Sequence, residues 1–335
     1  MIQPLVSILT PFKNTEQYLV ECLNSICNQS YQNWELLIVN DHSTDNSYSV
    51  VESYAKRDNR IKLFENEGAG VIEALRTAFK HSKGVLITRM DSDDVMTPEK
   101  LGVLSNLLIE QGRGHVAIGH VKYFSENGIG DGYDKYERWI NGLTFEGSNF
   151  QEIYKECVVP SPNFMVYKDD LLKCGDFQSD LYPEDYDLTF RFYKNKLVCI
   201  PCDKLTHHWR DYSTRSSRTD NHYSNENLLD IKIHYFLALE HDANRPLAIW
   251  GAGDKGKFIA RKLVKKNIPF HWICDNPNKI GHIIYGQEML NIDYLATLQN
   301  PQSIVSVANE EAQKEIRSYM NQKEMIPMQD YFFFC

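Results

Sequence analysis

The sequence predicts an α/β protein, with a mostly parallel sheet in a first domain and a second, smaller α/β domain after it. Short apolar runs rich in β-branched residues alternate with segments of helical period, the pattern of a parallel sheet covered by helices. The length of 335 residues suits about two domains at ~150 residues each. A new series that consists of a strand, a glycine-rich turn and a helix begins at Leu247. We therefore expect a first domain over 1–222, a helical linker over 223–245 and a second domain over 246–335.

Five apolar runs are predicted to form the strands of the first domain. They are LVSILT (5–10), WELLIV (34–39), RIKLF (60–64), GVLITRM (84–90) and HVAIGHV (115–121). Between the first two runs a helix is expected, because apolar side chains recur there on one helical stripe. The residues of this stripe are Tyr18, Leu19, Cys22, Leu23, Ile26 and Cys27. Ligands of open parallel sheets bind beyond the carboxyl ends of the strands, so the polar residues that follow these runs are the candidates for a site.

The charge and hydropathy of the chain exclude several classes of protein. Acidic residues number 45 and basic residues 36, and the net charge of −9 disfavours bulk attraction to nucleic acid, so we expect no nucleic-acid partner. No apolar run approaches the ~18 residues of a membrane-spanning helix. The first residues, MIQPLVSILTPF, lack the charged segment and the cleavage site of a secretory signal. We expect a cytoplasmic protein.

Eight cysteines are spread along the chain, which without a secretory signal favours reduced thiols. Cys199 and Cys202 precede His207 and His208, so a zinc site is one interpretation. The gap between these pairs is far shorter than the ~12 residues usual between pairs of zinc ligands. The spacing therefore favours two buried thiols at a strand end.

Polar residues follow the first and the second predicted strands. The first strand ends in Thr10, Pro11, Phe12, Lys13 and Asn14, and the second ends in Asn40, Asp41 and the segment HSTD (42–45). These side chains can hydrogen-bond a base or a ribose. The second segment equally suits a turn that caps the next helix, with Ser43 or Thr44 as the N-cap.

An acidic loop, consisting of Asp91, Ser92, Asp93 and Asp94, follows the fourth predicted strand. Helix capping explains the loop poorly, because the next helix has its own start signal in TPE (97–99). Crowded carboxylates repel one another unless a cation lies among them, and Mg²⁺ and Mn²⁺ prefer oxygen ligands. The pattern predicts a Mn²⁺ or Mg²⁺ site that also binds phosphate, and a solvated acidic turn is the alternative.

Glu184 and Asp185 open a predicted short buried helix, YDLTFRFYKN (186–195). Acidic side chains in a first helical turn after Pro183 are favoured by the helix dipole and need no function. In the functional interpretation, a carboxylate held there stays ionised at neutral pH and accepts a proton from a substrate hydroxyl. The sequence leaves both interpretations open.

The polar segment LTHHWRDYSTRSSRTD (205–220) contains two histidines and three arginines: His207, His208, Arg210, Arg215 and Arg218. Guanidinium groups match phosphate oxygens, so the arginines could close over a diphosphate, and an imidazole could complete a metal shell. A solvated basic loop is the alternative.

Together these pieces give the region from about Pro4 to Arg218 a resemblance to the family 2 glycosyltransferases. These are inverting enzymes of the glycosyltransferase A-type fold that use nucleotide-diphosphate sugars. The matching pieces are VSILTPFKN, YLVECLNSICNQSY, WELLIVNDHSTDNS, ITRMDSDD and PEDYDLTFRFY, in the family's order. They extend over nearly two thirds of the chain, and their combination is far more specific than any one of them.

The resemblance implies a role for most of the candidate residues. The donor would be bound by Thr10, Pro11, Phe12, Asn14, Asp41, Arg89, Asp91, Ser92, Arg215 and Arg218. The metal, Mn²⁺ or Mg²⁺, would be held by Asp93 and by His207 or His208, with Asp91 in its shell or on the ribose. Asp185 would be the catalytic base, and Glu184 would support it. Two features depart from the family: Phe12 stands where a tyrosine is common, and NEGAGVIEALRTAF (66–79) lacks the Arg-Asn-x-Gly often seen there.

The resemblance also implies the reaction, an inverting transfer from a nucleotide-diphosphate sugar, with a UDP-sugar expected, to an acceptor hydroxyl in surface-polysaccharide or glycoconjugate synthesis. Glycan or lipid-linked acceptors are typical of the family and would bring the protein into peripheral contact with the inner face of the membrane. Acceptor-facing residues are expected in the segment 125–148, where Gly128, Gly130 and Gly132 suggest an irregular, mobile lid.

The C-terminal part has a nucleotide-binding pattern of its own. A predicted helix (225–240) is followed by the strand LAIW, a GxGxxG turn, a helix and a strand that ends in an acid, which is the dinucleotide-binding fingerprint. The candidates for this second nucleotide site are Gly251, Gly253, Gly256 and Asp275. The same glycines serve tight helix-to-strand packing, so an interaction or scaffold role is favoured, resembling the small Rossmann-like domains appended to some bacterial sugar-transfer enzymes.

Two other functions stay open. One is an NAD-dependent sugar-modifying enzyme that uses the C-terminal glycine turn. The other is a regulator that binds a nucleotide sugar without catalysis.

Overall fold

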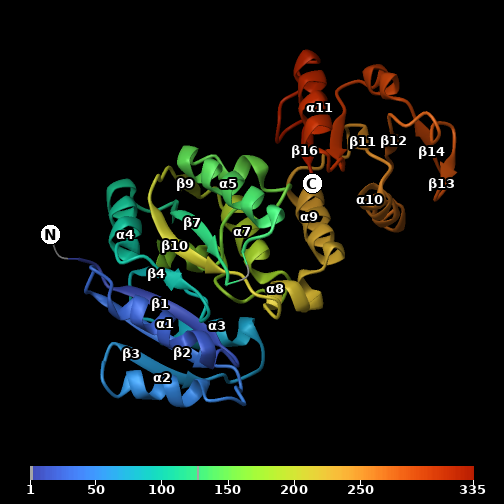
Figure 1. The fold of residues 1–335 in the computed structure, drawn as a ribbon. Coiled ribbons are helices and arrows are strands. Elements are labelled where there is room, and N and C mark those ends of the chain that lie inside the picture. The colour runs from blue at the N-terminus through green and yellow to red at the C-terminus, as the bar shows by residue number, and fades with distance from the viewer. Residues whose placement is uncertain (1–2, 127) are drawn as a thin grey trace. The chain divides into compact units, whose positions relative to one another are not determined.

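Figure 1 shows the fold in a computed structural model, which describes residues 3–126 and 128–335. The chain divides into two compact units: the first unit consists of residues 1–150 and 158–220, and the second unit of residues 151–157 and 221–335. The domain boundaries expected from the sequence stay a prediction. Within the described ranges, no helix is long and apolar enough to cross a membrane.

The first unit contains a seven-stranded sheet in the order β3-β2-β1-β4-β8-β6-β9. Its strands are β1 (Val6–Phe12), β2 (Trp34–Asn40), β3 (Ile61–Glu65), β4 (Leu86–Arg89), β6 (His115–Ile118), β8 (Phe164–Tyr167) and β9 (Val198–Ile200). All neighbours are parallel except β8, which runs antiparallel to both β4 and β6. The predicted α/β class with a mostly parallel sheet is confirmed. Cys199 lies in β9, and its thiol and that of Cys202 are both buried, as the packing interpretation predicts.

A smaller sheet in the first unit has the order β5-β10-β7, with β5 (Val95–Met96), β10 (Leu205–Arg210) and β7 (His120–Phe124). The run HVAIGHV, predicted as one strand, therefore divides at Gly119 between the two sheets. A Cβ at Gly119 would lie only 2.0 Å from Oγ1 of Thr206, so the chain can pass β10 there only as glycine. The pairing of His207 with Met96 places β10 beside the acidic loop.

Helices cover both faces of the large sheet (Figure 1). The helices of this unit are α1 (Glu16–Cys27), α2 (Ser47–Ala55), α3 (Val71–His81), α4 (Lys100–Gln111), α5 (Asp131–Glu146), α6 (Lys168–Lys173), α7 (Glu184–Lys194) and α8 (Ser216–Thr219). Alternate residues of β1 and β2 enter two cores, one shared with α1, α2 and α4 and the other with α3, α6 and α7. In the predicted stripe of α1, the four inner residues Leu19, Cys22, Leu23 and Ile26 are fully buried.

The segment predicted as an irregular, mobile lid is mostly helix, so the expected irregular structure is wrong, while its mobility and its contact with an acceptor stay predictions. Helix α5 occupies 131–146 despite Gly132 in its first turn. Two of its polar side chains satisfy the backbone of β7: Glu137 accepts a hydrogen bond from the N–H of Tyr123 (2.6 Å), and Asn141 accepts one from the N–H of Val121 (2.9 Å). These tertiary contacts outweigh the weak helix propensity of the glycines. Gly128 and Gly130 precede the helix.

The second unit contains a six-stranded sheet in the order β13-β14-β12-β11-β15-β16, parallel except for the pair β13 and β14. Its strands are β11 (Leu247–Trp250), β12 (His271–Ile273), β13 (Ile283–Ile284), β14 (Gln287–Leu290), β15 (Gln302–Val305) and β16 (Tyr331–Phe333). Its helices are α9 (Asn225–Leu239), α10 (Asp254–Lys265) and α11 (Glu310–Gln322). The strands and helices predicted from Asn225 onward are thus present in the predicted order.

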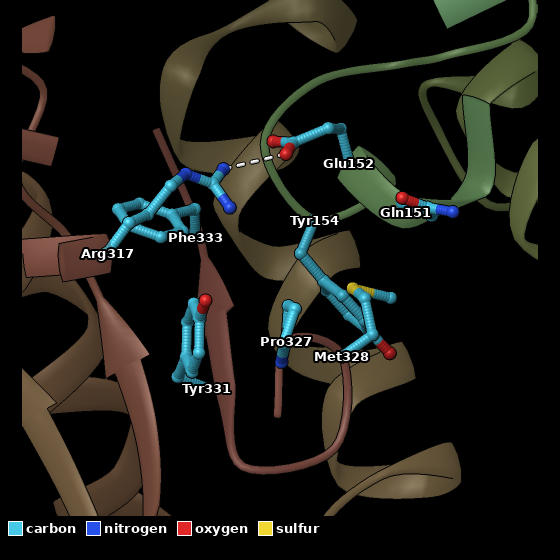
Figure 2. Close-up of a pocket in the computed structure, with 8 residues that line it drawn as sticks. All are labelled: Gln151, Glu152, Tyr154, Arg317, Pro327, Met328, Tyr331 and Phe333. Carbon is cyan, nitrogen blue, oxygen red and sulfur yellow. Dashed lines mark hydrogen bonds and ion pairs between the residues drawn. The ribbon is translucent and has the colours of Figure 1, made fainter. Parts of the chain in front are cut away.

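Residues 151–157 belong to the second unit, although the residues before and after them in the chain belong to the first (Figure 2). Tyr154 is almost fully buried, and its ring stacks on Phe334 at 5.4 Å. Glu152 lies 2.6 Å from Arg317, whose guanidinium lies over the ring of Phe333 at 4.2 Å. This ion pair borders a small pocket and connects the segment 151–157 to α11 and, through the ring of Phe333, to β16. The residues that line the pocket are Gln151, Glu152, Tyr154, Arg317, Pro327, Met328, Tyr331 and Phe333.

Candidate functional site

The acidic loop lies directly after β4, and its three carboxylates have different surroundings. Asp94 is fully buried, Asp93 is 9% exposed, and Asp91 is partly exposed. Asp94 accepts a hydrogen bond from the backbone N–H of Arg210 (2.8 Å), and its Oδ2 lies 2.9 Å from Nε2 of His207. Both partners come from β10, so β10 anchors the end of the loop through Asp94.

The imidazole of His207 is engaged at both nitrogens. Its Nδ1 lies 3.2 Å from Nζ of Lys100, a fully buried lysine at the start of α4 that also donates to the carbonyl oxygen of Pro162. Burial lowers the pKa of His207 well below its usual value, and the charge of Lys100 acts in the same direction. A neutral ring then donates from Nε2 to Asp94 and accepts at Nδ1 from Lys100. This arrangement holds Asp94 in place and leaves His207 no ring nitrogen for a metal ion.

Asp93 is held by the segment that follows β10. The hydroxyl of Tyr212 donates to Oδ2 of Asp93 (2.8 Å), and Nε of Arg210 donates to the carbonyl oxygen of Asp93 (2.7 Å). Arg215 is 8% exposed, and its guanidinium lies over the ring of Trp209 at 5.0 Å. No pattern in the sequence selects Tyr212, because an isolated tyrosine in a polar segment has no distinguishing feature.

Burial and mutual repulsion act on the carboxylates of this loop. Burial and the repulsion of Asp94 raise the pKa of Asp93 to about 7, although the charge of Arg215 opposes the rise. Burial likewise raises the pKa of Asp94, against the charge of Arg215 and with added repulsion from Asp91. A bound cation would relieve this repulsion.

The carboxylates of the acidic loop suit a divalent cation whose other ligands come from a bound phosphate. Over the part of the chain that the structure describes, no three His, Cys, Asp or Glu side chains are arranged to hold a metal ion. Mg²⁺ is usually bound by one or two carboxylates, with substrate phosphates and waters as its other ligands. Asp91 and Asp93 fit that description. His208 is half-buried, with its ring 6.3 Å from that of Phe124, and its assignment as a ligand stays a prediction.

Arg89, the last residue of β4, joins the acidic loop to the start of α7. Its Nε donates to Oδ1 of Asp91 (3.1 Å), and its Nη1 donates to Oε1 of Glu184 (3.0 Å). The side chains of Arg89 and Glu184 are 9% and 6% exposed. A buried ion pair of this kind is costly to break, because the remaining charge is left without a partner.

Asp185, in the first turn of α7, borders a cavity with mostly apolar walls. The residues that line the cavity are Arg89, Val159, Ser161, Phe164, Phe177, Glu184, Asp185, Leu188, Thr189 and Phe192. Burial and the repulsion of Glu184 raise the pKa of Asp185 to about 7, and the charge of Arg89 opposes this rise. The expectation that the helix start alone keeps this carboxylate ionised is therefore incomplete, because burial acts against the dipole. A pKa near the working pH suits a general base.

At the tip of β2, Asp41 is the centre of a second polar network. Its Oδ1 accepts hydrogen bonds from Nδ2 of Asn66 (2.6 Å) and from the N–H of Gly70 (2.9 Å), and its Oδ2 lies 3.2 Å from Nζ of Lys13. Burial alone would raise the pKa of Asp41, but these donors outweigh it and lower the pKa. Asn66 directly follows β3, so the strand-tip rule that selected Asp41 could also have selected Asn66.

The residues predicted at the tip of β1 have separate surroundings. The hydroxyl of Thr10 is buried and has no hydrogen-bond partner among the described residues. Phe12 is 2% exposed and belongs to the core that α1 covers. Asn14 adopts a left-handed backbone (φ 50°), and its Oδ1 accepts from the N–H of Thr44 (2.7 Å). Pro11 precedes Phe12 in β1 and is partly exposed.

Two other predicted donor contacts already have protein partners. Oγ of Ser92 lies 3.1 Å from Oγ1 of Thr15, which links the acidic loop to the start of α1. Arg218 donates two hydrogen bonds to the carboxylate of Asp211 (2.9 and 2.8 Å) and lies over the ring of Tyr133. The charge of Arg215 acts on Asp94, Asp93 and Asp91 of the acidic loop.

In the second unit, the glycine turn is closely packed. A Cβ at Gly256 would lie 2.2 Å from the carbonyl oxygen of Gly251, and Gly251 itself has φ 126°. Nε1 of Trp272 donates to that same carbonyl oxygen (2.9 Å). These contacts account for two of the three glycines by packing alone. Asp275 follows β12 and is exposed.

We expect Gly256→Ala to destabilise the second unit by about 1–3 kcal/mol, the usual cost of overpacking. Gly253→Ala is the matched control, because a Cβ there meets nothing within 4 Å and φ is −80°. Thermal unfolding of both variants checks this expectation, with calorimetry of NAD(H) binding alongside. If the wild type binds NAD(H) and Gly253→Ala abolishes that binding, the glycines serve a nucleotide and the packing interpretation is wrong.

This chain is similar to known glycosyltransferases. A family model described as Glycosyl transferase family 2 matches residues 7–175, just over half of the chain. The glycosyltransferase GlyG of Streptococcus pneumoniae serotype 4 is 31% identical over an alignment of 211 residues, and the match covers 58% of this chain and 68% of GlyG.

Two solved structures have a similar fold. Residues 1–349 of S. aureus TarS, in complex with UDP-GlcNAc, match 77% of this chain and 71% of that chain with a TM-score of 0.54 and 19% identity. The mannosyltransferase PcManGT from Pyrobaculum calidifontis, in complex with GDP-Man and Mn²⁺, matches 71% of this chain and 64% of that chain with a TM-score of 0.50 and 19% identity. At such identities the likeness concerns the fold, and it confirms the expected glycosyltransferase A-type fold.

Proposed function

The chain belongs to glycosyl transferase family 2, and from this premise we propose that it transfers a sugar from a UDP-sugar to a hydroxyl group of a glycan or lipid-linked acceptor, with inversion at the anomeric carbon. The observation that supports the proposal most strongly is the chain of ion pairs from Asp91 through Arg89 to Glu184, beside Asp185. These ion pairs connect Asp91, a candidate ligand of the cation, to the helix start that carries Asp185, the candidate base.

In this mechanism Asp185 accepts the proton of the acceptor hydroxyl while the hydroxyl oxygen attacks the anomeric carbon. The leaving diphosphate lies on the other side of the sugar, so the configuration inverts. Asp91 and Asp93 would hold Mn²⁺ or Mg²⁺, which when bound stabilises the charge that develops on the diphosphate. Arg215, which is buried and whose charge acts on Asp94 and Asp93, would add positive charge near the diphosphate.

The TarS complex with UDP-GlcNAc and the Mn²⁺ complex of PcManGT support a nucleotide-sugar donor and a divalent cation for this fold. An acceptor in surface-polysaccharide or glycoconjugate synthesis would place the protein at the inner face of the membrane. The NAD-dependent alternative would need the glycine turn of the second unit as a cofactor site, and packing accounts for two of its glycines.

A screen of nucleotide sugars for hydrolysis, with and without Mn²⁺, tests the proposal. We expect release of UDP from at least one UDP-sugar, dependent on Mn²⁺ or Mg²⁺. Failure to hydrolyse any nucleotide sugar, together with binding of a UDP-sugar, would favour a non-catalytic regulator instead.

A further inference from the structure

The guanidinium of Arg89 is engaged on two sides inside the first unit. Its Nε donates to Asp91 and its Nη1 donates to Glu184, and the arginine side chain is only 9% exposed. An arginine that clamps a diphosphate needs N–H groups directed at the phosphate oxygens. Here two edges of the guanidinium are occupied by carboxylates of the protein.

These contacts connect two elements that the chain separates widely. Arg89 ends β4, and Glu184 begins α7, 95 residues later. Asp185 follows Glu184 in the same first helical turn, and its Oδ1 accepts from the N–H of Tyr186 (2.8 Å). Fixing the carboxylate of Glu184 therefore fixes the start of α7 and with it the direction of Asp185.

We propose that Arg89 is a positioning residue that acts on Asp185 through Glu184, and that it does not bind the donor phosphates. This inference rests on the proposed function, in which Asp185 is the base. Arg89 and Glu184 then form an ion pair whose two charges shift the pKa of Asp185 in opposite directions.

The charged groups that act on Asp185 are Glu184, Arg89 and Asp91. The other walls of its cavity include Phe164, Phe177, Leu188 and Phe192. Glu184 raises the pKa of Asp185, and Arg89 lowers it. Replacing either member of the pair should therefore move the protonation of the base, in opposite directions.

The test measures kcat/KM against pH for the full chain and three variants: Arg89→Met, Glu184→Gln and the double variant. Removal of a charge within ~4–6 Å shifts a pKa by about one unit or more. We expect the acid limb of the profile to move up by about one pH unit in Arg89→Met and down in Glu184→Gln, with the double variant in between. In Glu184→Gln the KM for the donor should change by less than about threefold, since Arg89 keeps its contact with Asp91 in that variant.

A donor-binding role for Arg89 has a different signature. It would raise the donor KM by about tenfold or more in Arg89→Met and leave the acid limb in place, and that result would overturn the inference. If Arg89→Met does not fold, Glu184→Gln alone decides, because its acid limb either moves down or does not; Arg89→Lys, which keeps the charge, should restore the wild-type limb. A wild-type protein that transfers no sugar at all would instead count against the proposed function.

Discussion

Asp185→Asn is expected to lower kcat by about 10²- to 10⁴-fold, the usual contribution of a positioned general base. Asparagine has the size of aspartate and its side-chain oxygen can still accept from the N–H of Tyr186, so the start of α7 should keep its structure. It cannot take the proton of the acceptor hydroxyl. Steady-state kinetics with the donor found in the screen measure the loss, and calorimetry should give a Kd for UDP within about twofold of the wild type.

Asp169→Asn is the matched control for this prediction. Asp169 forms a surface ion pair with Arg113, in which both side chains are 59% exposed, so its replacement should leave kcat unchanged. If Asp185→Asn keeps more than about a tenth of the wild-type rate, Asp185 is not the general base. If it loses UDP binding instead, the residue belongs to the donor site.

Asp93→Asn is expected to abolish the Mn²⁺-dependent part of UDP binding and to lower kcat/KM by about 10²- to 10³-fold, in line with the loss of charge stabilisation at a leaving group. The asparagine oxygen can still accept from the hydroxyl of Tyr212. The negative charge that would attract the cation is gone. Calorimetry of UDP with and without Mn²⁺ measures the first effect, and kinetics measure the second.

The same substitution should not destabilise the metal-free protein. Burial and the repulsion of Asp94 raise the pKa of Asp93 to about 7 in the folded state, well above its value in an unfolded chain. The folded state therefore holds this proton more tightly, and stability falls as pH rises from about 4 to about 7. Above pH 7 the variant lacks this penalty, so its thermal midpoint should equal or exceed that of the wild type.

Asp203→Asn provides the comparison for Asp93. Asp203 is 60% exposed in an ion pair with Lys204, and its replacement should change neither Mn²⁺ dependence nor stability. Equal Mn²⁺-dependent UDP binding in Asp93→Asn and the wild type would contradict a metal site at the acidic loop. A thermal midpoint well below the wild type at pH 8 would show that the carboxylate of Asp93 stabilises the fold.

Much of the fold could be predicted because it depends on local patterns. Four of the five predicted runs each overlap one strand and the fifth overlaps both β6 and β7, and the stripe from Leu19 to Ile26 is the buried face of α1. Asp91 and Asp185 could be selected as candidates because each follows a recognisable element end. Helix α5 could not be predicted, because the glycines near its start disfavour a helix. The contacts that stabilise it, from Glu137 and Asn141 to β7, are tertiary.

The partners of the candidate residues were beyond local patterns. Lys100 reaches His207 across 107 positions of the chain, and His207 reaches Asp94 across 113. Nothing near Lys100 in the sequence marks it as a buried cation. The segment 151–157, which belongs to the second unit, likewise has no local signal that separates it from its neighbours.

Periodicity and end signals act between near neighbours in the chain, so they were enough to predict most strands of the large sheet, the helices α1 and α7 and the carboxylates at the ends of these elements. The surroundings of each carboxylate depend on the folded chain: Asp94 lies against His207, Glu184 is paired with Arg89, and Asp185 borders a cavity with mostly apolar walls. The physical reason is that burial and ion pairing set the energy of a charge, and both come from residues that only folding brings together.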